Sequence, residues 1–186
     1  DQTGEALKAL DQAVRRDPQS AAALLLRASV KDRLEDFLGA ADDYGSVLEI
    51  NPAFSWARLG RGKSLRRAKD YGGAQREFSA FLQSNPDHEQ ASYLRSHVRY
   101  MLGDYRGAEA DLTTAISLNA RNGLAYANRG MARAALGAVK EAAADLRKAL
   151  ELDPSRRERI QAALDSLGAE NAAPERPAAQ YPTFIQ

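Results

Sequence analysis

The sequence repeats itself at an interval of 34 residues. Proline stands at positions 18, 52, 86 and 154, each time after Asp or Asn, and Ala120 occupies the one skipped position of the series. Neither insertions nor deletions interrupt the register. A fixed period of this length predicts a solenoid, in which each period is one small unit that buries its apolar face against its neighbours.

Small and large apolar residues recur at fixed places within each period. Small side chains at matching sites allow two helices to approach closely, and a large apolar side chain one turn further on fills the space beside them. Each period is therefore predicted to form two antiparallel helices. The small residues of the first helices are Ala28, Gly62, Ser96 and Gly130, those of the second helices are Ala6, Ala40, Ala74, Ala108 and Ala142, and the large residues are Leu10, Tyr44, Phe78, Leu112 and Leu146.

The segments between the expected helices carry residues typical of turns and helix caps. Gly103 can end a first helix, and Asp36, Asp70 and Asp104 can cap the second helices that follow them. The Asp or Asn before each proline then ends the second helix, because a residue before proline disfavours the helical conformation.

With these features the chain resembles the tetratricopeptide repeat (TPR) family, most clearly in "NRGMARAALGAVKEAAADLRKALELDP" (residues 128–154). The resemblance covers residues 4–168 and implies an all-α fold, a right-handed superhelix of antiparallel helix pairs. It departs from the family where Trp is usual early in the first helix, at Val47 and Phe81 in place of a common second alanine, and at Ala120. The expected parts are a leading half repeat (4–17), four complete repeats (21–52, 55–86, 89–120 and 123–154) and a capping helix (157–168).

The two ends of the chain carry further expectations. The capping helix has Ile160, Ala163, Leu164 and Leu167 on one face, and Gly168 is expected to end it. Residues 169–186 are rich in Ala and Pro, so they are expected to form a flexible tail. The opening half repeat and the first residue, Asp1, suggest a fragment or a processed form.

Composition restricts the class of protein only weakly. The chain has 26 basic and 25 acidic side chains, so its net charge favours no nucleic acid partner. The longest purely apolar run, residues 21–26, is too short to cross a membrane, and we expect no membrane insertion. Cysteine is absent, which leaves the compartment open: cytoplasmic, or periplasmic or secreted if a signal segment was removed.

The stretch "ARLGRGKS" (residues 57–64) matches a loose form of the phosphate-binding loop. That motif needs a strand and a glycine-rich turn whose amides surround the phosphates. The 34-residue register instead places the stretch inside a first helix, with Gly62 at the small packing site. We therefore do not predict nucleotide binding.

Arginine recurs at one site of every complete repeat, and an acid follows it sixteen residues later. Such matched charges predict a structural ion pair between the two helices of each repeat. The alternative is a row of arginines that binds phosphates or acidic peptides. The predicted pairs are Arg27 with Asp43, Arg61 with Glu77, Arg95 with Asp111, and Arg129 with Asp145.

The resemblance implies that a partner peptide binds in the concave groove lined by first helices. The implied groove residues are aromatic and basic in the middle of the chain and smaller and more apolar towards its ends. They are Leu25, Trp56, Leu59, Lys63, Arg66, Tyr93, His97, Tyr100, Leu124 and Met131.

The middle of the groove lies in the strongest charge cluster of the chain. Six basic residues fall within twelve positions with no acid among them. Such a cluster is either a solvated helix surface or a site for an acidic or carboxylate-bearing peptide. The carboxylate clamp of the co-chaperone subgroup is not matched in either possible frame, which argues against the binding of chaperone tails. The cluster comprises Arg58, Arg61, Lys63, Arg66, Arg67 and Lys69.

Catalysis, metal binding and cofactor binding find no support in the sequence. Its two histidines, His88 and His97, share no helix face with carboxylates at ligand spacing, and His88 falls in a loop between repeats, where solvation is expected. We predict a non-catalytic scaffold that binds a peptide segment of another protein. The alternatives are self-assembly through the repeat edges or the tail, and an accessory region of a longer enzyme. The apolar end of the tail, residues 181–186, is a candidate peptide for docking in its own groove, in that of a second copy or on a partner.

Overall fold

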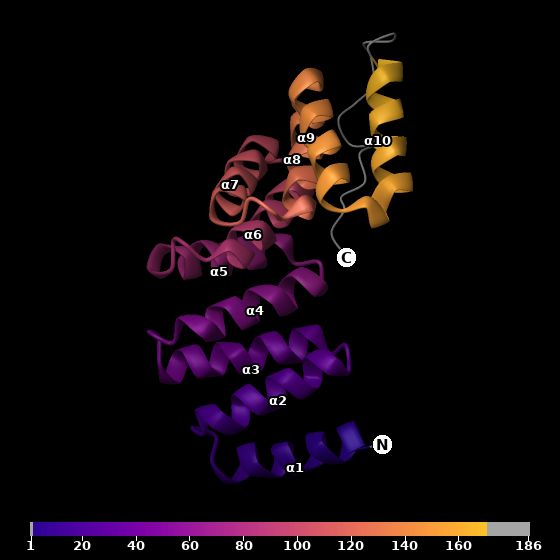
Figure 1. Cartoon of the computed structure of the whole chain (residues 1–186). Coiled ribbons are helices and arrows are strands. Elements are labelled where there is room, and N and C mark those ends of the chain that lie inside the picture. The colour runs from indigo at the N-terminus through magenta and orange to yellow at the C-terminus, as the bar shows by residue number, and fades with distance from the viewer. Residues whose placement is uncertain (1, 171–186) are drawn as a thin grey trace. The chain divides into compact units, whose positions relative to one another are not determined.

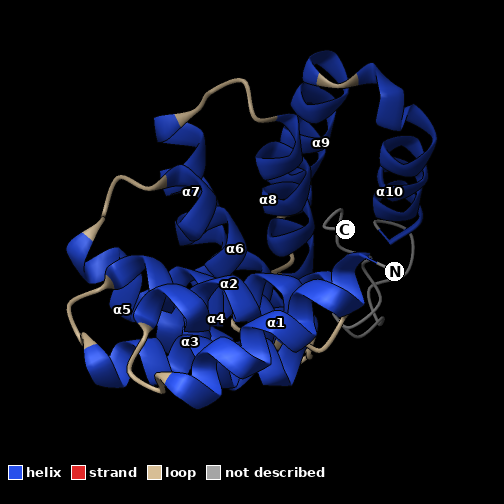
Figure 2. Ribbon diagram, turned by 90° about the horizontal axis from the view of Figure 1, so that it is seen from below, coloured by secondary structure: helices blue, strands red, loops and turns tan. Residues whose placement is uncertain are grey.

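The computed structural model describes residues 2–170. These residues form ten α-helices and one short 3-10 turn, and no strand occurs among them (Figures 1 and 2). The all-α solenoid of antiparallel helix pairs predicted from the sequence is confirmed. The chain divides into two units, Asp1–Pro86 and Asp87–Gln186.

Unit 1 is a stack in which each helix packs against the next one along the chain (Figure 1). Its first-type helices, α2 and α4, begin 34 residues apart, and so do its second-type helices, α3 and α5. The stack consists of α1 (Gln2–Arg16), α2 (Ala21–Arg33), α3 (Phe37–Ile50), α4 (Ser55–Arg67) and α5 (Tyr71–Ser84).

Unit 2 continues the same interval and adds a helix at its end. The 3-10 turn η1 (Pro154–Arg156) leads from α9 into α10, which packs against α9. The helices are α6 (Glu89–Met101), α7 (Tyr105–Leu118), α8 (Gly123–Ala135), α9 (Val139–Leu152) and α10 (Arg157–Glu170).

Side-chain caps start three of the second-type helices. Asp36, Asp70 and Asp104 each accept a hydrogen bond of 2.8–3.0 Å from the backbone N–H three residues later. That third residue is a glycine each time, because a Cβ at this site would overlap the capping carboxylate. The fourth helix, α9, follows Ala138 and has no side-chain cap.

The Asp or Asn before each proline ends a second-type helix by folding its side chain onto the following backbone. Oδ1 of Asp17, Asn51 and Asn119 accepts a hydrogen bond of 3.1 Å from the N–H two residues on. Asn85 differs, since its Nδ2 donates back to the Phe81 carbonyl. The loops between the helices are therefore short and fixed by local chemistry (Figure 2).

The small residues of the first helices allow close packing against the large residues of the second. A Cβ added to Gly62 would lie 2.7 Å from Phe78 Cε1, and one added to Gly130 would lie 3.0 Å from Leu146 Cγ. Phe78 and Leu146 are fully buried. These contacts give the physical reason for the repeating small and large residues in the sequence.

The C-terminal helix is longer than predicted. It runs through Gly168 to Glu170, because Gly168 does not take the left-handed conformation that ends a helix, unlike Gly103 (φ 80°) and Gly137 (φ 79°). Beyond residue 170, the predicted tail lies outside the described residues. Among residues 2–170, no helix has both the length and the apolar character needed to cross a lipid bilayer.

Candidate functional site

The phosphate-loop-like stretch lies wholly within α4. A helix interior uses its backbone N–H groups in hydrogen bonds to the preceding turn, so they are not offered to a phosphate. Ala57 and Gly62 are buried packing positions. Ser64, to which the sequence gave no role, is also buried and donates a hydrogen bond of 2.9 Å to the Asp32 carboxylate on α2.

Three of the four matched arginine–acid pairs have the same two-point geometry. In each, the arginine Nε and Nη2 donate to the two oxygens of one aspartate at 2.7–2.9 Å. The aspartates are almost fully buried. The hydrogen bond to the carboxylate raises the pKa of Arg27 and of Arg129 above the ordinary arginine value. These pairs are Arg27 with Asp43, Arg95 with Asp111, and Arg129 with Asp145.

A second cation, which our sequence analysis missed, completes each of these three sites. It comes from the residue four positions after the arginine, one turn along the same helix. Lys31 Nζ lies 2.9 Å from Asp43, and Arg99 and Arg133 lie 2.9 and 2.8 Å from the corresponding aspartates. The sequence does carry the signal, since a basic residue recurs at this site in three of the four repeats.

The second repeat departs from this arrangement. Its acid is Glu77, and Leu65 stands where the other repeats have the second cation. Arg61 Nη1 makes a single contact of 3.3 Å with Glu77 Oε1, and Arg58 approaches Oε2 at 3.6 Å. The Arg61 side chain stays 37% exposed, against 13% for Arg129. Two of the six clustered basic residues are thus partly neutralised by an acid that is distant in the sequence.

Asp32 of α2 faces the remaining basic residues of α4. Burial raises the pKa of Asp32, while the Ser64 hydrogen bond and the charges of Arg67 and Lys63 act against that rise. Arg67 places its guanidinium 4.3 Å from the centre of the Phe37 ring and donates to the Asp32 carbonyl at 3.3 Å. The cluster that lacks an acid in the sequence therefore has one beside it in the fold.

Lys63 is half-buried, and this placement is electrostatically unfavourable. Burial and the nearby charge of Arg66 lower the pKa of Lys63, and the attraction of Asp32 compensates only in part. Trp56, on the same helix, is 57% exposed, with its ring centre 5.5 Å from that of Phe81. We call Trp56, Lys63 and Arg66 the α4 face; it joins a large exposed aromatic to two cations.

Leu59, predicted to line the groove between Trp56 and Lys63, is only 3% exposed and presents no surface to a ligand. The corresponding sites of the other repeats are also packing positions. Leu25 packs against a core cluster of unit 1, Tyr93 packs against one of unit 2, and Ala127 belongs to the core of unit 2. This site of the first helix faces neighbouring helices, which explains the burial.

In unit 2, α6 carries Tyr93, His97 and Tyr100, all half-buried. The Tyr93 hydroxyl accepts a hydrogen bond of 3.0 Å from Asn128 Nδ2. Tyr100 meets the Tyr105 ring edge-on at 5.1 Å between centres, and burial raises the pKa of its hydroxyl.

The fourth-repeat groove residues Leu124 and Met131 are largely taken up by the core of unit 2. Met131 is 1% exposed, in a cluster that includes Ile160 and Leu167 of α10, and Leu124 packs against the same cluster. The prediction that Met131 lines a groove is therefore wrong, because the side chain is enclosed in a core to which α10 contributes.

The histidines take no part in a metal site among the described residues, where no group of three potential ligand side chains occurs. His88 has a structural role that was not expected: its Nδ1 accepts a hydrogen bond of 3.1 Å from the Ala91 N–H and so caps α6.

Comparison with known proteins agrees with this architecture. The family model described as tetratricopeptide repeat matches residues 1–54, 59–105 and 93–157. A search of curated protein sequences finds no match.

Solved structures share the fold. MamA from Desulfovibrio magneticus RS-1 is 21% identical with a TM-score of 0.77, over 83% of this chain and 87% of that one. YrrB, described as a TPR protein with an unusual peptide-binding site, is 20% identical with a TM-score of 0.75, over 94% and 89% of the two chains. The first TPR of Spaghetti (RPAP3), bound to the HSP90 peptide SRMEEVD, is 25% identical with a TM-score of 0.60, over 64% and 94%. With its helix pairs at a 34-residue interval, its matched small and large residues and these similarities, the chain belongs to the tetratricopeptide repeat family.

Proposed function

We propose that this protein is a non-catalytic scaffold that binds an acidic peptide segment of a partner protein on the α4 face. The observation that carries the proposal is the placement of Lys63. A half-buried lysine with a lowered pKa costs stability in the free protein, and such a cost is typical of residues kept for function. A carboxylate of the peptide would supply the negative charge that Asp32 supplies only in part.

The rest of the α4 face suits the same ligand. Trp56 offers a large, rigid apolar surface, and exposed aromatic residues beside cations are the usual anchors of a peptide interface. Arg66 adds a second positive charge, whereas Arg58 and Arg61 are engaged with Glu77. The α6 residues Tyr93, His97 and Tyr100 form a separate aromatic surface on unit 2, which we propose as a second contact region.

Two of the similar structures support peptide binding as the class of function. YrrB is described as having a peptide-binding site, and the Spaghetti domain holds a peptide with three acidic residues. Residues of the co-chaperone carboxylate clamp are missing from this chain, so we propose a different acidic peptide. The scaffold is built from the four complete repeats at 21–52, 55–86, 89–120 and 123–154, since the helices begin at that interval.

The test uses a display library of random peptides selected on the full chain. We expect the selected peptides to be enriched in Asp and Glu. A Lys63→Glu/Arg66→Glu variant should bind them at least tenfold more weakly, equivalent to about 1.4 kcal/mol. The matched control is Lys8→Glu/Arg76→Glu, which makes the same change of charge at two exposed sites of the same unit and should bind normally.

Peptides that bind the wild-type chain and the Lys63→Glu/Arg66→Glu variant equally would overturn the α4 face as the site. An equal loss in the control variant would mean that the chain attracts acidic peptides through its overall charge and not through this face.

A further inference from the structure

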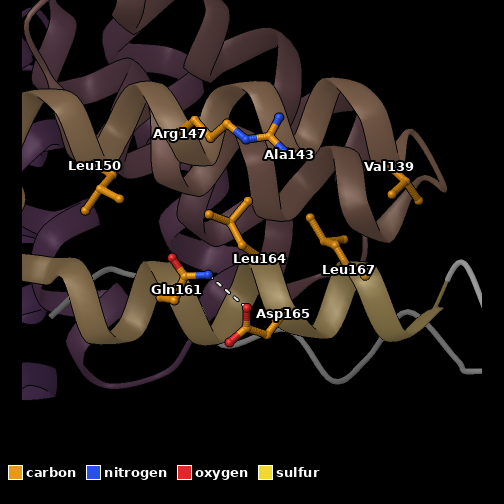
Figure 3. Close-up of a pocket in the computed structure, with 9 residues that line it drawn as sticks. Val139, Ala143, Arg147, Leu150, Gln161, Leu164, Asp165 and Leu167 are labelled. Atoms are coloured by element: carbon orange, nitrogen blue, oxygen red, sulfur yellow. Dashed lines mark hydrogen bonds between the residues drawn. The ribbon is translucent and has the colours of Figure 1, made fainter.

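An apolar groove of about 450 Å³ runs between α9 and α10 in unit 2 (Figure 3). Leu164 and Leu167 of α10 point towards α9, whose Val139 and Leu150 line the opposite wall. The rim is polar: Gln161 donates a hydrogen bond of 2.8 Å to Asp165, and Arg147 stands on the α9 side. Among the described helices, none follows α10 to cover this groove.

The groove occupies the place where a second-type helix would pack in a complete repeat, but it is not built for one. The first-helix sites that meet such a helix are small in all four repeats, namely Ala28, Gly62, Ser96 and Gly130. The next residue of that series, 34 positions after Gly130, is Leu164. A leucine at this site keeps a helix from approaching closely and suits an extended segment that inserts separate side chains.

The chain that follows α10 has the composition of such a segment. Prolines at positions 174, 177 and 182 disfavour a helix, and the last part carries Tyr181, Phe184 and Ile185. We propose that residues 181–185 of the same chain dock in extended form in the α9–α10 groove, where these three side chains cover the apolar end of the solenoid.

The lengths are compatible with docking within one chain. From Val139 to Leu150 the groove follows α9 for ~16 Å at 1.5 Å per residue. Five extended residues span about 17 Å, and the ten residues 171–180 reach up to ~34 Å, enough to turn back to the groove. A tether this short gives a local concentration in the millimolar range, which favours the chain's own segment over that of a second copy.

The test follows the methyl resonances of the groove in the full chain. The protein has no cysteine, so Gln186→Cys provides a single attachment point for a paramagnetic spin label. We expect the label to broaden the methyl signals of Leu150 and Leu164, and to leave those of Leu112 and Ile116 on α7 sharp. Dilution should not change the result.

The deciding variant is Tyr181→Ser/Phe184→Ser/Ile185→Ser in the labelled chain, which should restore the groove signals. The matched control, Ala172→Ser/Ala173→Ser/Ala178→Ser, should leave them broadened. Groove methyls that stay sharp in the labelled chain, or are broadened equally in the deciding variant, would overturn the proposal. Broadening that arises only when spin-labelled protein is mixed with isotope-labelled, cysteine-free protein would assign the segment to a second copy and would equally overturn it.

Discussion

Arg129 binds Asp145 at two points, with Nε and Nη2 donating to the two carboxylate oxygens at 2.8 and 2.7 Å. The pair joins the two helices of one repeat, α8 and α9, and Arg133 adds a third contact to the same aspartate at 2.8 Å. Arg61 and Glu77 occupy the corresponding sites of the second repeat, with one contact of 3.3 Å. The repeat thus contains a strong and a weak version of one interaction.

Replacing Arg129 by methionine should lower the free energy of unfolding by about 3 kcal/mol, because it leaves a buried carboxylate with only one of its two cations. Arg61→Met should cost about 1 kcal/mol or less, since this pair is more exposed and has poorer geometry. Urea unfolding followed by circular dichroism measures both losses. Equal losses would show that the two-point geometry does not set the strength of the pair. Peptide affinity should be unchanged in Arg129→Met, as expected for a structural contact.

Lys63→Met should have the opposite profile. Because burial lowers the pKa of Lys63, the charged form is disfavoured in the folded state, and removing it should leave the unfolding free energy unchanged or higher. Binding of acidic peptides should fall roughly tenfold, or about 1.4 kcal/mol. Fluorescence anisotropy with a selected peptide and thermal unfolding of the same preparation test both expectations. A variant that loses stability and keeps its affinity would make Lys63 a structural residue.

Asp32 should affect how stability depends on pH. Its folded pKa lies above the ordinary value of 3.8, so the folded state takes up a proton before the unfolded chain does. The penalty of the buried charge is therefore present above the folded pKa and disappears as the pH falls from there to 3.8. We expect the stability of Asp32→Asn relative to wild type to increase as pH rises through this window, measured by urea unfolding at each pH. A relative stability that decreases with pH would mean that the charge of Asp32 is stabilising.

The turns between paired helices offer a gain in stability. Glu35 (φ 62°) and Lys69 (φ 65°) take the left-handed conformation at the site where the third and fourth repeats have Gly103 and Gly137. A side chain at such a φ costs about 1 kcal/mol, part of which glycine returns as freedom of the unfolded chain. Lys69→Gly should therefore raise the unfolding free energy by about 0.5 kcal/mol, seen as a higher Tm. Gly103→Ala is the reverse experiment and should lower it; a rise in Tm there would contradict the argument.

Much of the fold could be predicted because a repeat presents the same packing problem several times. A small residue opposite a large one, such as Gly62 opposite Phe78, recurs in every complete repeat, and the recurrence separates a packing rule from chance. The arginine–acid pairs were predicted in the same way. The second cation at Lys31, Arg99 and Arg133 follows the same register and was missed because Leu65 interrupts the series in the second repeat.

The candidate site was less predictable, because exposure depends on neighbours that the period does not describe. Leu59 and Met131 stand at helix positions that the family resemblance assigns to the groove, yet both are buried. Met131 is enclosed in a core that includes Ile160 and Leu167, which come from a helix outside the regular repeats. Helical spacing fixes the direction of a side chain but not what lies opposite it.

The sequence by itself determined the repeating unit, its helix boundaries and the pairing of charges within each repeat, because these depend on short distances along the chain that recur every 34 residues. Only the tertiary structure decided which charges remain for a ligand. Glu77 and Asp32, both distant from the basic cluster in sequence, lie against it after folding and partly neutralise it. Electrostatic interactions depend on distance through space, so the charge left at Lys63 and Arg66 is a property of the packed helices and not of their composition.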